Sequence, residues 1–141
     1  MKSWKESQVR IVKKDFEMAK SILKMIEVRT KASEILTSDE FISLKLEGYY
    51  EVIKETITAL MAVGGYKTLS HEVLVSYLKE FYTEFSESEI SLIDQIRRLR
   101  NKIAYKGFFI DKDYLDRNEI KIKSIIEKLR HTLNSKLENK K

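Results

Sequence analysis

Cysteine and proline are both absent from this 141-residue chain, and glycine occurs only four times. Without cysteine the chain can form neither disulfides nor thiolate metal sites. Average proline usage would give about seven prolines at this length. With none, and with so few glycines, few positions can stop a helix.

Long apolar runs are also missing. No run approaches the ~18 residues that a membrane-spanning helix needs, so we expect no membrane partner. The opening sequence MKSWKESQVR lacks the apolar core of a secretory signal. Together with the absence of cysteine, this predicts a cytoplasmic location.

Histidine is scarce, since only His71 and His131 occur. Neither has a second ligand at the spacing of a zinc site, so we expect no metal. The chain has no glycine-rich loop that could cradle a phosphate, and we expect no cofactor. The neighbours Ser70 and His71 favour a helix cap beside a surface histidine over a nucleophile–base pair.

The composition is otherwise that of a folded helical domain, with 43% apolar and 35% charged residues. Apolar side chains recur at three- and four-residue steps along most of the chain, which is typical of amphipathic helices. We predict an all-α, single-domain bundle of about five helices over residues 1–141, with no competing strand. The expected helices cover about 3–29, 37–63, 71–85, 86–107 and 112–137, and the tail at about 136–141 is expected to fray.

Capping residues and glycines mark the helix ends. TSDE (37–40) and SESE (86–89) both read as capping boxes. The pair Gly64–Gly65 and the single Gly107 are the natural stops, because glycine adopts the left-handed conformation without a Cβ penalty. Gly48, in the middle of a helix, predicts a close crossing with another helix.

The positive charge is concentrated in one place. The stretch QIRRLRNKIAYKGFF (95–109) contains five cations, Arg97, Arg98, Arg100, Lys102 and Lys106. With Asp94 they give residues 94–106 a net charge of +4, out of +5 for the whole chain. Such a patch favours binding to phosphates or to acidic surfaces.

A helical wheel separates these cations. Arg100 falls about 40° from Ile96, at the edge of the apolar seam, so it is the cation that we expect to be partly buried, while Arg98 faces outward. One interpretation is a structural arginine paired with a glutamate of a neighbouring helix. The other is a phosphate site built from Arg100, Asn101 and Tyr105, with Arg97, Arg98, Lys102 and Lys106 supplying the surrounding field.

Geometry limits the second interpretation. Residues 100 and 105 stand about 140° apart on an uninterrupted helix. Gly107 predicts that the helix unwinds nearby, which would bring the Tyr105 hydroxyl back toward Arg100.

The stretch YYEVIKETITALMAVGGYKTLSHEVLVSYLKEF (49–81), followed by RRLRNKIAY (97–105), resembles HEPN domains, a family of small α-helical proteins. The family motif is an arginine, then four to six residues of which the first is often asparagine, then a histidine. Arg100 and Asn101 match its first half, and Tyr105 stands where the histidine is expected. The resemblance covers roughly residues 9–133 and implies a HEPN-like up-and-down bundle.

The resemblance implies a function. Many HEPN proteins are metal-independent ribonucleases of toxin–antitoxin or defence systems, others are partners of small nucleotidyltransferases, and the family commonly forms homodimers. It implies that Arg100, Asn101 and Tyr105 form the site. Because tyrosine is a poor general base at neutral pH, we expect a homodimer that binds RNA or a nucleotide. Two alternatives stay open: an active ribonuclease with a variant site, and a non-catalytic partner of a small nucleotidyltransferase.

Overall fold

The computed structural model describes residues 8–139. Within this range the elements are, in chain order, β1 (Val9–Ile11), α1 (Phe16–Ile35), the 3-10 helix η2 (Asp39–Phe41), α2 (Ile42–Gly64), β2 (Tyr66–Thr68), α3 (His71–Phe81), α4 (Glu87–Lys106) and α5 (Lys112–Glu138). The structure is 80% helical with five helices and one small sheet, which confirms the predicted all-α bundle.

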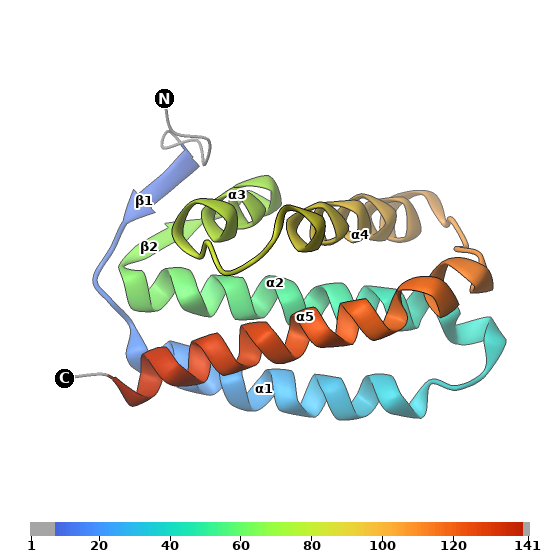
Figure 1. Cartoon of the computed structure of the whole chain (residues 1–141), viewed down its shortest axis with the longest axis horizontal. Helices are drawn as coiled ribbons and strands as arrows, with labels where there is room; N and C mark the ends of the chain where they lie inside the picture. Colours follow the sequence, from blue (N-terminus) through green and yellow to red (C-terminus); the bar gives the residue numbers. More distant parts are fainter. Residues whose placement is uncertain (1–7, 140–141) are drawn as a thin grey trace.

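Helix α2 runs through the middle of the bundle. It packs against all four of the other α-helices, with α1 and α5 on one side and α3 and α4 on the other (Figure 1). Its buried residues include Leu46, Ile53 and Leu60, each with 0% exposure. The sequence shows the reason, because α2 carries apolar residues on two faces and both must be covered. None of the helices in residues 8–139 is both long enough and apolar enough to cross a membrane.

The first predicted helix begins too early. Val9–Ile11 is a strand that pairs antiparallel with Tyr66–Thr68, and α1 begins only at Phe16. Asp15 caps α1 by accepting a hydrogen bond from the Met18 N–H at 2.9 Å. The expectation that no strand forms is therefore wrong here, and the part of that helix before residue 8 lies outside the described residues.

The other helix ends agree better with the sequence. Ser86 and Glu89 form the predicted capping box of α4, and Gly65 and Gly107 end α2 and α4 at φ of +86° and +62°. The predicted box TSDE is wrong: Ser38 precedes the 3-10 helix and makes no capping bond with its side chain.

Two C-terminal boundaries also differ from the prediction. Helix α3 ends at Phe81, where the Tyr82 N–H bonds the Leu78 carbonyl and the chain turns toward Ser86. Helix α5 continues to Glu138, so the expected fraying from about 136 is wrong up to that residue. Leu137 packs against the core and holds this last turn in place.

Helices α1 and α2 cross closely at Gly48, as the sequence predicted. A Cβ atom at this position would lie 2.8 Å from the Oγ atom of Ser33, a buried residue of α1. This distance is shorter than a van der Waals contact, so a side chain at position 48 would collide with the Ser33 hydroxyl.

We predict that the effect of Gly48→Ala on stability depends on Ser33. In the parent chain the substitution should lower the free energy of unfolding by about 1–3 kcal/mol, because the new methyl group overpacks the crossing. In a Ser33→Ala background it should raise it by about 1 kcal/mol, because alanine is the better helix former. Urea unfolding followed by circular dichroism measures both. Stabilisation in both backgrounds would show that the crossing is not tight.

Candidate functional site

The basic segment lies on the second half of α4. Arg98 points outward, with 72% of its side chain exposed, as the wheel predicted. Arg100 is mostly enclosed at 19%, but Arg97 is enclosed further, at 12%. The expectation that Arg100 is partly buried is confirmed, but Arg97, which lines the groove between α3 and α4, is enclosed further.

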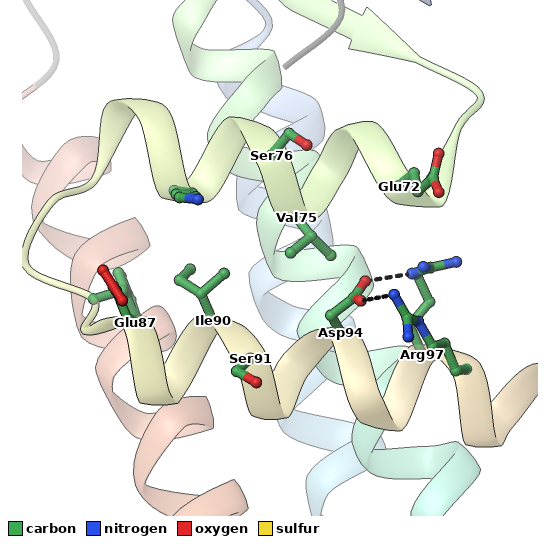
Figure 2. Close-up of a pocket in the computed structure, with 11 residues that line it drawn as sticks. Glu72, Val75, Ser76, Glu87, Ile90, Ser91, Asp94 and Arg97 are labelled. Carbon is green, nitrogen blue, oxygen red and sulfur yellow. Dashed lines mark hydrogen bonds and ion pairs between the residues drawn. The ribbon is translucent and has the colours of Figure 1, made fainter. Parts of the chain in front are cut away.

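Asp94 forms ion pairs with both Arg97 and Arg98. Its carboxylate accepts from Arg97 Nε at 2.9 Å and pairs with Arg98 Nη2 at 3.0 Å (Figure 2). The three side chains form one end of a groove of about 500 Å³ between α3 and α4, in which Val75 and Ile90 also lie. Both guanidinium groups are thus neutralised in part by a close carboxylate on their own helix.

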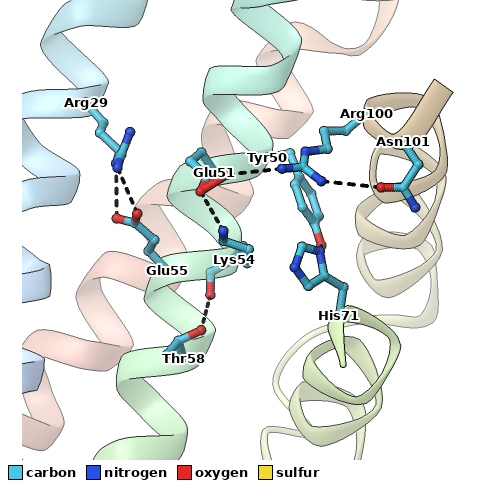
Figure 3. Close-up of polar contacts among 9 residues, drawn as sticks. All are labelled: Arg29, Tyr50, Glu51, Lys54, Glu55, Thr58, His71, Arg100 and Asn101. Carbon is cyan, nitrogen blue, oxygen red and sulfur yellow. Dashed lines mark hydrogen bonds and ion pairs between the residues drawn. The ribbon is translucent and has the colours of Figure 1, made fainter. Parts of the chain in front are cut away.

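Arg100 is held more loosely. Its Nη1 lies 3.4 Å from the side-chain oxygen of Asn101, and its Nη2 lies 3.9 Å from a carboxylate oxygen of Glu51 on α2 (Figure 3). The other oxygen of Glu51 pairs with Lys54 at 2.6 Å. Glu51 is therefore shared, and its shorter contact is with Lys54.

Two tyrosine rings also contact Arg100. Its Cζ atom lies 5.9 Å from the ring centroid of the buried Tyr50 and 5.9 Å from that of the exposed Tyr105. At this distance the ring faces attract the cation. Helix α4 ends at Gly107, but it stays helical through Lys106, so the expectation that unwinding turns Tyr105 back toward Arg100 is wrong. The long Arg100 side chain nevertheless reaches the Tyr105 ring.

His71 joins this group, which the sequence did not predict. Ser70 caps α3 by accepting from the Val73 N–H, as expected, and this places His71 in the first turn. The Nδ1 atom of His71 lies 3.1 Å from the Tyr50 hydroxyl, on the central helix. We call the whole group the Arg100 cluster; its members are Tyr50, Glu51, Lys54, His71, Arg100, Asn101 and Tyr105.

The surroundings of His71 and Tyr50 shift the pKa values of both side chains. Burial lowers the pKa of His71, and the charges of Lys54 and Arg100 lower it further. Burial raises the pKa of Tyr50 to about 12, although Arg97 and Arg100 act in the opposite direction. At neutral pH both side chains are therefore uncharged. A Tyr50 hydroxyl that donates to Nδ1 leaves the imidazole proton on Nε2.

The two lysines of the predicted site lie farther along α4. Lys102 Nζ lies 5.6 Å from the ring centroid of Phe108, and Lys106 is exposed in the last turn. The structure thus separates the predicted residues. Arg100, Asn101 and Tyr105 come together, Arg97 and Arg98 are paired to Asp94, and Lys102 lies beside an aromatic ring.

Chemically, the Arg100 cluster offers donors for an anion. Its donors are the guanidinium of Arg100, the amide of Asn101 and the ammonium group of Lys54. Figure 3 shows the Glu51 carboxylate between Lys54 and Arg100, and the side-chain oxygen of Asn101 turned toward Arg100. Residues 8–139 contain no group of three His, Asp or Glu side chains that could hold a metal ion. Comparison of the chain with protein-family models, with curated proteins and with solved structures found no significant match.

We predict that His71 titrates below its ordinary pKa of 6.5. The unfolded chain then takes up this proton at a higher pH than the folded one, so this contribution to stability is present above pH 6.5 and lost below it. Proton NMR of the imidazole, assigned with His131→Gln, measures the value. Lys54→Gln should raise it, because it removes a nearby positive charge.

Lys45 provides the matched control. It also lies on α2 but pairs with Glu119 at 3.2 Å, on the α5 side of that helix. Lys45→Gln should leave the titration of His71 unchanged. A pKa of 6.5 or more for His71 in the parent chain would contradict the arrangement.

Proposed function

We propose that this chain is a HEPN-like protein of a toxin–antitoxin or defence system that acts as a homodimer and binds RNA or a nucleotide. A phosphate group would contact the guanidinium of Arg100, with Asn101 and Tyr105 as additional donors. The resemblance of Arg100 and Asn101 to the family motif supports the proposal, and so does the geometry around Arg100.

The single observation that supports the proposal is that the polar contacts of Arg100 are long. Arg97 and Arg98 each have a carboxylate oxygen at 2.9 or 3.0 Å, while the polar contacts of Arg100 are 3.4 and 3.9 Å. A mostly enclosed guanidinium needs close acceptors to offset its desolvation. A phosphate supplies them, because its oxygens match the planar fork of arginine.

The alternative interpretation is that Arg100 is a structural residue paired with Glu51. Glu51 is a glutamate on a neighbouring helix, as that interpretation requires, but at 3.9 Å it lies at the edge of ion-pair distance. Its closer contact, at 2.6 Å, is with Lys54. We therefore favour phosphate binding over a purely structural pair.

We predict that Arg100→Ala weakens RNA or nucleotide binding by about 1–3 kcal/mol, the scale of a lost charged hydrogen bond. The fold should stay helical, because the pair with Glu51 is long. Fluorescence anisotropy with a labelled RNA oligonucleotide measures the affinity, and circular dichroism measures the fold. If Arg100→Ala unfolds the protein and the parent binds no nucleotide, the arginine is structural.

Two variants sharpen this test. Arg98→Ala removes an equal but exposed charge, so it should cost less affinity and mainly flatten the salt dependence. Glu51→Gln removes the carboxylate that competes for Arg100, so it should tighten phosphate binding. Sedimentation of the same samples measures self-association, and a monomer of 16.7 kDa at tens of micromolar would contradict the homodimer.

A second candidate function, a metal-independent ribonuclease, is favoured by one specific observation. The family histidine is replaced by Tyr105, but His71 lies in the same cluster and its pKa is lowered. A neutral imidazole at neutral pH is the form that accepts a proton. Arg100 would stabilise the charge on the phosphate while His71 takes part in proton transfer.

We predict that, if the purified protein cleaves RNA, both Arg100→Ala and His71→Gln abolish cleavage, while His71→Gln still binds RNA. The reason is that His71 would move a proton and Arg100 would hold the phosphate. Gel analysis of labelled RNA measures cleavage, and Tyr105→His, which restores the family residue, should increase it. Cleavage that survives His71→Gln would remove this histidine from the reaction.

A further inference from the structure

A second open site lies near the C-terminal end of α4. A pocket of about 460 Å³ separates this end from the beginning of α2, and Leu44, Ala104, Phe108 and Phe109 are among its walls. Three of these are large apolar side chains left exposed, Phe109 at 78%, Leu44 at 51% and Phe108 at 42%. We call this the end pocket.

The aromatic wall of the end pocket is fixed by the backbone on both sides. Before it, Gly107 ends α4 in the left-handed conformation and the Phe108 N–H bonds the Lys102 carbonyl at 3.2 Å. After it, the Ile110 N–H donates to the Oγ atom of the buried Ser43 at 2.9 Å. Phe109 is thus held between two anchors with most of its ring in solvent. Because the backbone on both sides of Phe109 is fixed, this segment loses little conformational entropy when a ligand covers it.

The end pocket begins about one helical turn beyond the Arg100 cluster, along both α2 and α4. Glu51 of α2 lies opposite Arg100, and Glu47, one turn earlier on α2, lines the end pocket together with Ala104. Along α4 the distance from Arg100 to Ala104 and Gly107 is about 6–10 Å at 1.5 Å per residue.

The chemistry of the pocket selects the base and excludes the phosphate. Glu40 and Glu47 line its rim, and their carboxylates repel a phosphate. The same carboxylates can accept hydrogen bonds from the exocyclic amine of a base. Flat aromatic walls provide surfaces on which a base of any sequence can stack.

The cations just outside the pocket favour a strand over a free nucleotide. Lys102 lies over the Phe108 ring, and Lys106 is exposed one turn farther along α4. Aromatic side chains interleaved with lysines are the pattern with which proteins hold a single strand, the bases on the rings and the backbone on the cations.

We propose that the end pocket binds an unpaired base of a single-stranded RNA whose adjoining phosphate lies on Arg100, with Phe109 as the stacking residue. This inference rests on the proposed function, and it adds the part of the ligand that the Arg100 cluster does not recognise.

The test compares two ligands, a labelled single-stranded RNA decamer of adenosines and inorganic polyphosphate, which has no bases. Phe109→Leu keeps the apolar volume and removes the ring. It should lower affinity for the decamer by about 5- to 150-fold, the range of a lost stacking contact, and leave affinity for polyphosphate unchanged. Phe109→Tyr keeps the ring and should bind the decamer within about twofold of the parent.

Ile120→Ala is the matched control, because Ile120 is an apolar residue with 85% exposure on α5. It should leave both affinities unchanged. Because Phe109 is largely exposed, its substitution should also leave the fold intact, which circular dichroism checks.

Five results would overturn the inference, and they separate it from the proposed function. If Arg100→Ala weakens decamer binding and Phe109→Leu does not, the phosphate site stands and the base pocket fails. If Phe109→Leu weakens polyphosphate equally, its effect is not on a base. If it turns a dimer into a monomer without changing decamer affinity, the pocket is an interface between two copies. If the parent binds a nucleotide but no RNA, only the base pocket fails, and if it binds neither, both proposals fail together.

Discussion

The burial of α2 is the constraint on which the rest of the structure depends. A helix with apolar residues on two faces must be covered on both, and the other four α-helices provide that cover. Polar side chains of α2 can then reach solvent only along the seams between its neighbours. Tyr50, Glu51 and Lys54 lie along one such seam, facing α3 and α4 (Figure 3). The position of the Arg100 cluster therefore follows from the packing of the core.

The same constraint explains how much of the fold could be predicted. Apolar periodicity and capping residues act over four to seven residues, so they predict helices and most of their ends. They fail where pairing between segments far apart in the sequence determines the local structure. Val9 and Val12 fit a helical step, but Val9–Ile11 pairs with Tyr66–Thr68, and the Val12 N–H bonds the Gly65 carbonyl. The capping box at 37–40 fails because a 3-10 turn precedes α2.

The site shows the same division. Arg100, Asn101 and Tyr105 lie within six residues of one another, so sequence could bring them together. His71 could not be found in this way, because it reaches the cluster through Tyr50, which is 21 positions earlier in the chain. A helical wheel of α4 also could not show that Arg97 is more enclosed than Arg100, because it contains no information about the neighbouring helix α3. The only signals in the sequence were the Ser70 cap and the paired tyrosines, and neither gives a distance.

Tyrosine at position 105 gives the site different electrostatics from those that a histidine there would give. A histidine there would gain a second positive charge beside Arg100 whenever it was protonated, and the two charges would repel. The Tyr105 ring instead attracts the guanidinium at 5.9 Å without gaining positive charge as the pH falls. In the proposed ribonuclease, proton transfer would then fall to His71, whose pKa is lowered first by burial and further by the charges of Lys54 and Arg100. A phosphate on Arg100 would reverse that field and raise the pKa of His71, so in this arrangement ligand binding and proton uptake are coupled.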